Sequence, residues 1–281
     1  MEKELVKPLR EVLDAARLGF YETEGKAICL PFTADEIRQV KVYTLETLGK
    51  LCPEAIPAVE PVRIVLRNQD TLQAAFDLNQ IRQQGEMPVL VLNFANPRRP
   101  GGGIREIPGT QEEHLCVKTT VYASLASEEA KTFYDTNKTC GTQAQTDAVM
   151  ISPNTLVLRN PDLSFREDPF PVSVLTVSAP IASRMKEAER TDLEKILRRR
   201  IRGMLRAAVD GGYRYLVLGA WGCGNFRNDP VLVARLFREV LEEPLGEVRT
   251  KDYFLRITMA VFDRSEEKKL YRAFEGFFEE G

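Results

Sequence analysis

The chain has 281 residues, of which 43% are hydrophobic and 28% are charged, the proportions of an ordinary globular protein that can bury a core. Its 39 basic and 41 acidic residues give a net charge of −2, so there is no global basic field and direct nucleic-acid binding is not expected. His114 is the single histidine, which excludes zincin and facial-triad metal chemistry because those sites need several histidines.

Cysteine usage and hydropathy indicate the cellular setting. The five cysteines are scattered and form no CxxC pair, which favours a reducing compartment over a disulfide framework. The opening stretch, MEKELVKPLREVL, is charged and lacks the apolar centre of a signal peptide. The longest apolar runs, such as VLVLNFA, are too short to span a bilayer. We therefore expect a cytoplasmic protein with no membrane partner.

The N-terminal part is predicted to be mainly helical. Apolar residues recur near helical spacing within residues 3–20. Thr33 and Glu36 form a capping-box pattern that opens a second helix over residues 33–49. A short strand is expected between the two helices, over residues 26–30.

From residue 62 onward, strands and helices are predicted to alternate. The expected strands are apolar runs that cover residues 62–66, 87–94, 148–153, 155–160, 170–180, 213–220 and 253–263. The expected helices cover residues 70–84, 110–125, 189–212, 229–243 and 264–278. Asp229 is the expected N-cap of one of them, with Pro230 at its first position. The alternation predicts a three-layer α/β/α domain. We assign residues 61–281 to this domain and residues 1–60 to a helical extension packed on it.

Two glycine-rich loops follow expected strands, at the sheet edge where α/β proteins bind ligands. After VLVLNF, Asn93 and Asn96 offer amide groups, and Gly101–Gly103 let a ligand approach bare backbone. After YRYLVLGA, the stretch GAWGCGNFRNDP offers backbone N–H groups before a helix, which suits a phosphate or diphosphate. Neither loop is a P-loop or a Rossmann fingerprint, and either one alone could simply end a strand.

Glu112 and Glu113 follow the triple glycine within the stretch TQEE. On local pattern alone, Thr110 and Glu113 form a capping box, and acidic residues in a first turn also favour the helix dipole. In the functional interpretation, the two carboxylates face the ligand and one donates a proton to a leaving oxygen, as glycoside cleavage requires. The two interpretations are partly compatible, because a carboxylate at a helix start can be both a cap and a ligand.

The triple glycine, a seven-residue bridge (IREIPGT) and then Gln-Glu-Glu resemble the signature of the microbial-type poly(ADP-ribose) glycohydrolases. The stretches LNFAN, LCVKTTVYASL, VLTVSAP, GAWGCGNFRNDP and LGFYETEGKAICL are also similar to that family, so the likeness covers most of the chain. The resemblance implies a macrodomain with a mixed central sheet. It implies hydrolysis of ribose–ribose O-glycosidic bonds at the chain terminus, with no metal and no cofactor. Poly(ADP-ribose) or ADP-ribosylated protein would be the substrate and ADP-ribose the product.

The resemblance also assigns roles to residues. Glu113 would be the general acid that protonates the ribose 2′-oxygen and then activates water, and Glu112 would hold hydroxyl groups of the bound chain end. Ligand contacts are implied for Asn96, Gly102, Gly103 and Gln111 near the distal ribose, for Ser178, Ala179 and Pro180 beside the adenine, and for Gly222, Cys223, Gly224, Asn225 and Phe226 around the diphosphate and terminal ribose.

The bridge Ile104–Thr110 departs from the small-residue pattern that is frequent in bacterial relatives, because it contains Arg105, Glu106 and Pro108. This bridge borders the sugar, so preference for polymer, single ADP-ribose units or another conjugate stays open. Two alternatives to the glycohydrolase are kept: a non-catalytic macrodomain that binds ADP-ribose, and a hydrolase of another ADP-ribose conjugate.

Four further features have simpler interpretations. Trp221 is expected in the core rather than at a ligand wall. A thiol mechanism at Cys223 is the weaker hypothesis, since His114 is the only histidine base. On a helix, His114 points about 100° away from Glu113 and is expected at the surface or in a supporting position. The run RRRIR (residues 198–202) is expected to be a solvated helix face, with attraction of a polyanion as the alternative.

Overall fold

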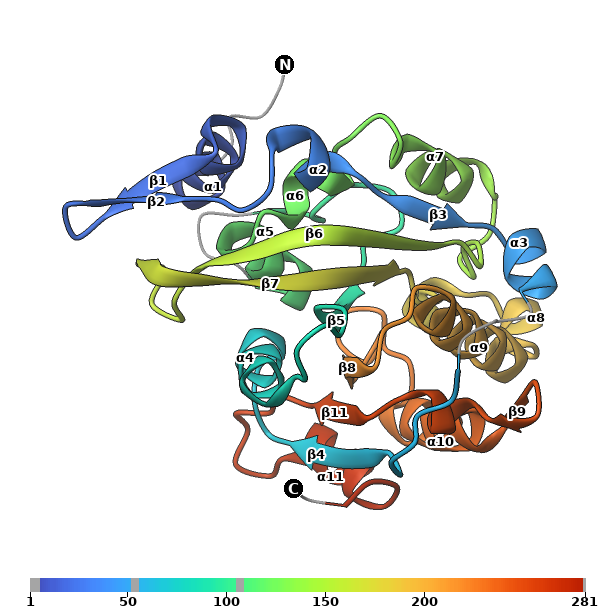
Figure 1. Cartoon of the computed structure of the whole chain (residues 1–281). Helices are drawn as coiled ribbons and strands as arrows, with labels where there is room; N and C mark the ends of the chain where they lie inside the picture. Colours follow the sequence, from blue (N-terminus) through green and yellow to red (C-terminus); the bar gives the residue numbers. More distant parts are fainter. Residues whose placement is uncertain (1–5, 52–55, 105–108, 280–281) are drawn as a thin grey trace.

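The computed structural model describes residues 6–51, 56–104 and 109–279. A seven-stranded sheet crosses the middle of the molecule, in the order β3-β6-β7-β5-β8-β11-β4 (Figure 1). The strands are β3 (Lys41–Tyr43), β4 (Arg63–Arg67), β5 (Val89–Phe94), β6 (Val149–Arg159), β7 (Phe165–Val177), β8 (Tyr215–Gly219) and β11 (Arg256–Ala260). The β3–β6 and β6–β7 pairs are antiparallel, whereas the pairs from β7 to β4 are parallel. The predicted mixed sheet is therefore confirmed.

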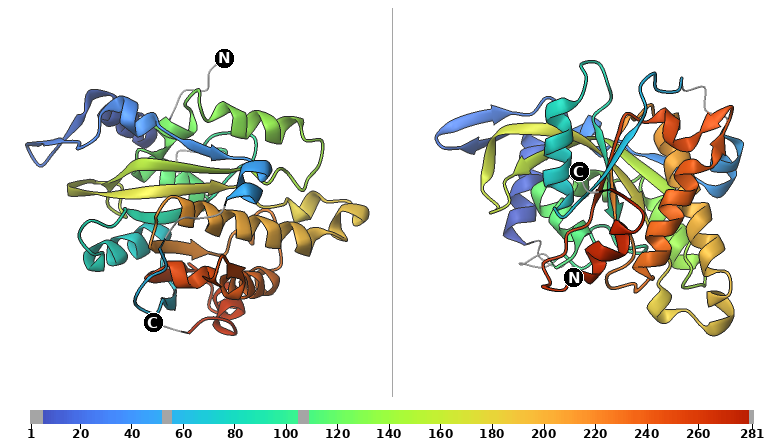
Figure 2. Two further views of the ribbon diagram at one scale, coloured as in Figure 1. Left: turned by 45° about the vertical axis from the view of Figure 1, so that its right-hand side comes forward. Right: turned by 90° about the horizontal axis from the view of Figure 1, so that it is seen from below.

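Both faces of the sheet are covered by helices. One face packs against α9 (Leu193–Asp210), α10 (Pro230–Glu242) and α11 (Lys269–Glu275). The other packs against α4 (Thr71–Ile81), α5 (Gln111–Lys118), α6 (Val121–Leu125) and α7 (Lys131–Thr139). The view from below in Figure 2 shows α9 and α10 on one side of the sheet and α4 on the other. This arrangement is the predicted three-layer α/β/α fold.

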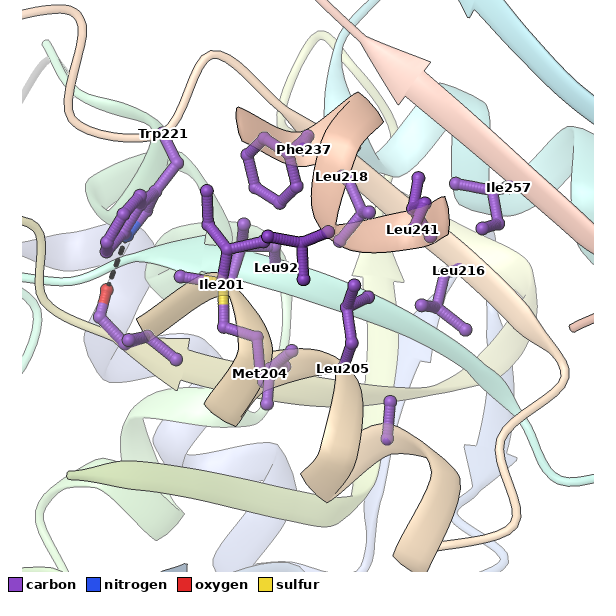
Figure 3. Packing of buried hydrophobic residues seen from close by; sticks show 14 of the residues in the cluster. Leu92, Ile201, Met204, Leu205, Leu216, Leu218, Trp221, Phe237, Leu241 and Ile257 are labelled. Carbon is purple, nitrogen blue, oxygen red and sulfur yellow. Dashed lines mark hydrogen bonds between the residues drawn. The ribbon is translucent and has the colours of Figure 1, made fainter. Parts of the chain in front are cut away.

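The near-continuous apolar runs of the central strands explain why each face of the sheet packs against its own apolar core. Along β5, Val89 and Val91 face one helical layer while Leu90 and Leu92 face the other, because successive side chains in a strand alternate between faces. Figure 3 shows Leu92 packed with leucines of β8 and with apolar residues of α9 and α10. Burial on both faces accounts for the run of four hydrophobic residues from Val89 to Leu92.

The N-terminal segment forms α1 (Lys7–Leu18) and an antiparallel hairpin of β1 (Phe20–Thr23) and β2 (Lys26–Cys29). Val12, Ala15 and Tyr21 form a small apolar cluster with Leu156 and Leu158 of β6. The helix over residues 3–20 and the strand over residues 26–30 are therefore confirmed, while β1 was not predicted.

The predicted second helix over residues 33–49 is wrong. The segment forms α2 (Ala34–Arg38), then β3, then α3 (Leu45–Lys50). The capping box of Thr33 and Glu36 is present, but α2 ends after five residues. The β-branched and aromatic residues at positions 40–43 favour a strand, and the free edge of β6 supplies its hydrogen bonds. A second capping box, from Thr44 and Thr47, then starts α3.

Two other predictions need correction. The helix expected over residues 110–125 breaks into α5 and α6, because Thr119 is extended and Thr120 exchanges hydrogen bonds of 3.0 Å with the backbone of Leu156. The strands expected over residues 148–153 and 155–160 are one strand, β6, with an irregularity between Ser152 and Thr155. Elements that were not predicted are α7, α8 (Glu187–Arg190), η1 (Ala182–Arg184), η2 (Thr250–Tyr253), β9 (Pro244–Leu245) and β10 (Val248–Arg249).

The other predicted elements are confirmed within a few residues at their ends, including α10 with Asp229 as N-cap and Pro230 at its first position. No described helix combines the length and the apolar character needed to cross a bilayer. The parallel strands β5, β7 and β8 end at the same edge of the sheet. Both glycine-rich loops leave this edge, so the fold brings the two loops together.

Candidate active site

The start of α5 carries the two predicted catalytic glutamates. Thr110 is the N-cap, and its Oγ1 accepts from the Glu113 N–H at 3.3 Å. The expected capping box is only half formed, because the Glu113 carboxylate accepts from the Gly109 N–H (2.8 Å) rather than from Thr110. Glu112 and Glu113 are both buried, with 2% and 5% of their surfaces exposed. A short helix thus holds two carboxyl groups out of bulk water.

Gln111 fastens this helix start to the sheet. Its Nε2 donates to the backbone oxygen of Leu92 (2.7 Å) and to Thr71 Oγ1 (3.1 Å). Its Oε1 accepts from the Phe94 N–H at 2.9 Å. The amide is therefore engaged by β5 and α4 through both donors and its acceptor. The structure places Gln111 as a support for the neighbouring glutamates.

Glu112 is buried among hydrogen-bond donors from the end of β5 and the loop that follows it. Its Oε2 accepts from the Asn96 N–H (2.7 Å) and its Oε1 from Asn93 Nδ2 (3.4 Å). Burial raises the pKa of Glu112 to about 8; the bonds from Asn96 and Asn93 oppose this rise and the charge of Glu113 adds to it. Glu112 therefore keeps its proton at neutral pH for most of the time.

The triple glycine passes directly over the carboxyl pair. Gly101 and Gly102 have positive φ values of 65° and 66°, which glycine adopts without strain. A Cβ at Gly102 would lie 3.2 Å from Glu112 Oε2 and 3.9 Å from Glu113 Oε1. Gly103 is exposed, and a Cβ there would lie 3.5 Å from Glu113 Oε1. The glycines therefore leave open space beside the second glutamate.

Asn96 shapes the turn before the glycines. Its Oδ1 accepts from the N–H groups of Arg98 (2.9 Å) and Arg99 (3.1 Å), as in an Asx turn. Its backbone N–H binds Glu112, so Asn96 links the strand end, the loop and the carboxyl pair. In the bridge to α5, Arg105, Glu106 and Pro108 lie outside the described residues.

The second glycine loop lies against the end of β7. A Cβ at Gly222, where φ is 75°, would meet the Ala179 Cβ at 2.4 Å and Asn228 Nδ2 at 2.6 Å. Asn228 is buried and donates to the backbone oxygens of Pro180 (2.9 Å) and Gly222 (3.0 Å). Ser178, Ala179 and Pro180 are buried, so they form the support under this loop.

The tip of this loop offers backbone donors. Within the described part of the chain, the N–H groups of Gly224, Asn225 and Phe226 donate to no acceptor. Gly224 and Asn225 are exposed, and Phe226 is half-buried with its backbone oxygen held by the Ser183 N–H at 3.0 Å. Successive free N–H groups of this kind form a nest that suits an anion.

Cys223, in the same loop, is poorly suited to nucleophilic attack. Burial raises the pKa of its thiol to about 12, and the charge of Asp229 adds to the rise. The thiolate is the reactive form of cysteine, so this side chain stays unreactive at neutral pH. His114 is exposed, as expected for its position on α5.

Trp221 closes the base of the site. It has no exposed surface, and its Nε1 donates to the backbone oxygen of Val177 at 2.9 Å (Figure 3). The predicted core position is confirmed. The bond joins the loop after β8 to the last residue of β7, so it sets the spacing of two strand ends.

The arginine run on α9 differs from the expected solvated face. Arg198, Arg199 and Arg202 form ion pairs with Glu239, Glu243 and Asp147. Arg200 is 1% exposed and was missed as a structural residue of the site. The sequence did contain a signal, because position 200 lies on the same helical stripe as the buried Leu197 and Met204.

Arg200 holds three segments together. It pairs with Asp147 Oδ1 at 2.9 Å and donates to the backbone oxygens of Ser178 (2.8 Å) and Gln145 (2.9 Å). It also donates to the backbone oxygen of Ala144. The guanidinium thus joins α9, the end of β7 and the loop before β6.

Among the described residues, no three His, Cys, Asp or Glu side chains come together as a metal site. Two cavities lie elsewhere. One is bordered by β4, β11 and α4, and the other by Arg202, Arg206, Glu243, Pro244 and Thr250. The predicted site residues line neither of these two cavities.

Comparison with known proteins identifies the family. The family described as microbial-type PARG, catalytic domain, matches residues 10–160. Poly(ADP-ribose) glycohydrolase (PARG) from Thermomonospora curvata is 30% identical, with a TM-score of 0.86 over 96% of this chain and 98% of that chain. The same protein bound to the inhibitor ADP-HPD gives a TM-score of 0.83 at 30% identity, over 96% of this chain and 97% of that chain.

A third solved structure is that of the Deinococcus radiodurans enzyme in complex with ADP-ribose. It is 32% identical and has a TM-score of 0.77 over 89% of this chain and 98% of that chain. No curated protein sequence matches the chain. The family match spans more than half of the chain and the structural matches span nearly all of it, so the chain belongs to the microbial-type poly(ADP-ribose) glycohydrolase family.

Proposed function

We propose that this chain, a poly(ADP-ribose) glycohydrolase by family, cleaves the terminal ribose–ribose O-glycosidic bond and releases ADP-ribose, with Glu113 as general acid and base. The observation that carries the proposal is the buried carboxyl pair at the start of α5, packed under the triple glycine. Relatives of this fold bind ADP-ribose or the inhibitor ADP-HPD.

The contacts of Glu113 suit proton transfer in two steps. Oε2 is fixed by the Gly109 N–H, whereas Oε1 lies beside the exposed Gly103. We infer that a protonated Glu113 donates to the leaving 2′-oxygen as the C–O bond breaks to an oxocarbenium-like state. The resulting carboxylate then takes a proton from the attacking water, which restores the acid.

The contacts of Glu112 suit binding rather than proton transfer. Its carboxyl group is held by backbone and amide donors, and its pKa of about 8 keeps it neutral at pH 7. A neutral carboxyl group can donate to a ribose hydroxyl. The family role of Glu112 in holding hydroxyl groups is consistent with this state.

The loop after β8 suits the diphosphate. The free N–H groups of Gly224, Asn225 and Phe226 can donate to phosphate oxygens without any lysine or arginine. Ser178, Ala179 and Pro180 support this loop from below, and Asn96, Gly102 and Gly103 border the carboxyl pair. We propose these residues as the ADP-ribose site, with Gln111 as a positioning residue.

Substitution of Glu113 by Gln tests the proposal. The amide keeps the size of the side chain but cannot supply the proton, so we expect turnover on poly(ADP-ribose) to fall at least about 10³-fold. ADP-ribose affinity, measured by calorimetry, should stay within a few fold. Glu128→Gln, at an exposed position, serves as the control and should retain full activity. Full turnover by the Glu113→Gln variant would contradict the assignment.

The substrate class needs a separate assay. Purified protein is incubated with polymer, with mono-ADP-ribosylated protein and with a terminal ADP-ribosyl ester, and released ADP-ribose is quantified. Release from polymer supports the proposed activity. Retention of polymer without release would favour an ADP-ribose-binding protein, and release from the ester alone would favour a hydrolase of another conjugate.

A cytoplasmic location, proposed from cysteine usage, is checked by fractionation.

A further inference from the structure

A second charged feature lies at the outer edge of the sheet, away from the glycine loops. A cavity of about 140 Å³ opens between β4, β11 and α4. In Figure 1, β4 and β11 lie at the lower edge of the sheet with α4 beside them. We call this cavity the arginine groove. Its lining residues are Arg63, Val65, Arg67, Gln69, Asp77, Leu78, Ile81, Arg256, Ile257 and Thr258.

The arginines of the groove repel one another. Arg63 and Arg256 are direct partners in the parallel pairing of β4 with β11, so their side chains leave the same face side by side. Arg67 lies four residues further along β4, on that same face. Like charges in opposite positions of a sheet are destabilising. β4 is the edge strand of the sheet, where charged side chains also discourage pairing with another chain, and a bound anion would relieve the repulsion of this pair.

Little within the protein neutralises these charges. In the described part of the chain, none of the three arginines forms an ion pair, and Arg256 donates to the backbone oxygen of Leu255 (2.8 Å). The one acid in the lining, Asp77, offsets part of the charge of the three arginines and accepts from Gln73 Nε2 at 2.9 Å. The arginines of α9, by contrast, are paired with acids. The arginine groove therefore keeps a local positive charge on a chain of net charge −2.

The volume and donors of the groove indicate its ligand. Sites for drug-sized molecules enclose roughly 300–1,000 Å³. A cavity of about 140 Å³ is too small for a nucleoside but accepts a phosphate or diphosphate group. Guanidinium groups bind phosphate oxygens through paired hydrogen bonds. The chemistry therefore selects a phosphate-bearing anion.

The groove is connected to the catalytic helix. Thr71, at the first turn of α4, accepts from Gln111 Nε2, so α4 is shared by the groove and the start of α5. Arg63 and Arg256 are the first residues of β4 and β11, so this pair lies at the opposite edge of the sheet from the glycine loops, beside the last turns of α4. Three strand spacings, about 14 Å, separate β4 from β5, and the length of β4 adds roughly another 14 Å along the strands. A polymer with a diphosphate in every unit would run along the α4 side of the sheet to place a second diphosphate in the groove while its terminal unit is bound.

We propose that the arginine groove is an accessory site that binds a diphosphate of poly(ADP-ribose) outside the unit being cleaved, an inference that rests on the proposed function. Binding there adds affinity for long chains and leaves the chemical step unchanged. It also attracts a polyanion to a protein whose net charge is negative.

The double variant Arg63→Gln/Arg256→Gln tests the accessory site. We expect KM for long polymer to rise about 5- to 10-fold at low salt, with kcat unchanged and with no change on a two-unit substrate. The slope of log affinity against log salt should become shallower by about 1, because phosphate contacts are lost. The control is Arg17→Gln/Arg38→Gln, whose exposed side chains form short-range surface ion pairs on α1 and α2. The control should behave as the wild type.

The outcomes separate the sources of the anion. Inorganic pyrophosphate should compete with the two-unit substrate equally in both proteins, through the loop after β8, and should inhibit cleavage of long polymer more strongly in the wild type than in the double variant. If pyrophosphate binds the groove but the KM for polymer does not change in the variant, the site serves a free anion and the proposal is overturned. An unchanged KM and salt slope overturn it too.

Stability and binding measurements complete the test. The double variant should melt at the wild-type temperature or above it, since a like-charge pair is removed. A lower melting temperature with equal losses on long and short substrates would show a structural role and overturn the proposal. If the wild type releases no ADP-ribose, the proposed function fails independently. Polymer binding at the arginine groove is then measured by the fluorescence anisotropy of labelled polymer, and the proposal requires the wild type to bind more tightly than the double variant.

Discussion

At the scale of single residues, Asn93 and Glu112 show how burial sets protonation. The Oδ1 of Asn93 is buried and has no hydrogen-bond partner, while its Nδ2 donates to Glu112 and to Thr176 Oγ1 (3.3 Å). Reversing the amide lets Oδ1 accept a hydrogen bond from the O–H of a neutral Glu112. The unpartnered oxygen and the raised pKa of Glu112 therefore point to the same protonated state.

Glu112→Gln tests this state through the pH dependence of stability. The folded pKa of about 8 exceeds the ordinary value of 4.5, so between these pH values the unfolded chain loses a proton that the folded chain retains. The stability that the neutral Glu112 contributes to the wild type is therefore fully present below pH 4.5, and it is lost as pH rises through about 8. The amide variant avoids this loss, so we expect similar stabilities near pH 4 and a gain on the order of 3–5 kcal/mol at pH 8.

Urea denaturation from pH 4 to 9 measures this gain for Glu112→Gln and wild type. Glu128→Gln, an exposed glutamate, controls for a general charge effect and should follow the wild type at every pH. A difference between Glu112→Gln and wild type that does not vary with pH would contradict a buried, neutral Glu112.

At the scale of elements, the loops at the ends of β7 and β8 depend on partners far away in the sequence. Trp221 joins the ends of β7 and β8, and Asn228 joins the loop after β8 to Pro180. Arg200 then joins α9 to the end of β7 and to the loop before β6. The position of the loop after β8 is therefore set by buried polar side chains under it.

Arg200→Met measures the strength of this connection. The variant leaves the backbone oxygens of Gln145 and Ser178 without their buried donor, so we expect a loss of about 3 kcal/mol in the free energy of unfolding. Arg202→Met is the matched control: its side chain is half-exposed and pairs with Glu243, so the substitution should cost under about 1 kcal/mol. Equal losses of unfolding free energy for the two variants in urea denaturation would contradict a special structural role for Arg200.

At the scale of the whole molecule, the N-terminal segment is joined to the catalytic part. β3 hydrogen-bonds to the edge of β6, and Arg159 of β6 pairs with Glu11 of α1. We propose that residues 1–60 are an extension packed on a core of residues 61–281. The hydrogen bonds of β3 make this extension a part of the central sheet.

Deletion of residues 1–60 tests how far the core depends on the extension. Without β3 and α1, β6 presents an unpaired edge, and the apolar Leu156 and Leu158 lose their cover. We expect the shortened chain to be poorly soluble and to lack a cooperative thermal transition. A shortened chain with wild-type melting would show that the core folds alone.

Much of the fold follows from local patterns. Alternating apolar runs indicated the buried strands, and the caps at Thr33 and Asp229 are where the sequence places them. The length of α2 and the break at Thr119 could not be predicted in this way, because both depend on hydrogen bonds to β6, which is distant in the chain. The helix or strand propensity of a segment is a weak determinant of its secondary structure when a free strand edge offers hydrogen-bond partners.

In the candidate site too, some features follow from the sequence and others depend on tertiary contacts. The sequence by itself determined which residue types are present: the triple glycine, Gln-Glu-Glu and a second glycine loop, with a single histidine that leaves acid–base chemistry to carboxyl groups. Only the tertiary structure decided that Glu112 is buried with a raised pKa, that the Gln111 amide is hydrogen-bonded to β5 and α4, and that Arg200 lies inside the protein. The physical reason is that desolvation and hydrogen-bond partners come from strands and loops that are distant in sequence, so the folded surroundings set each group's charge and role.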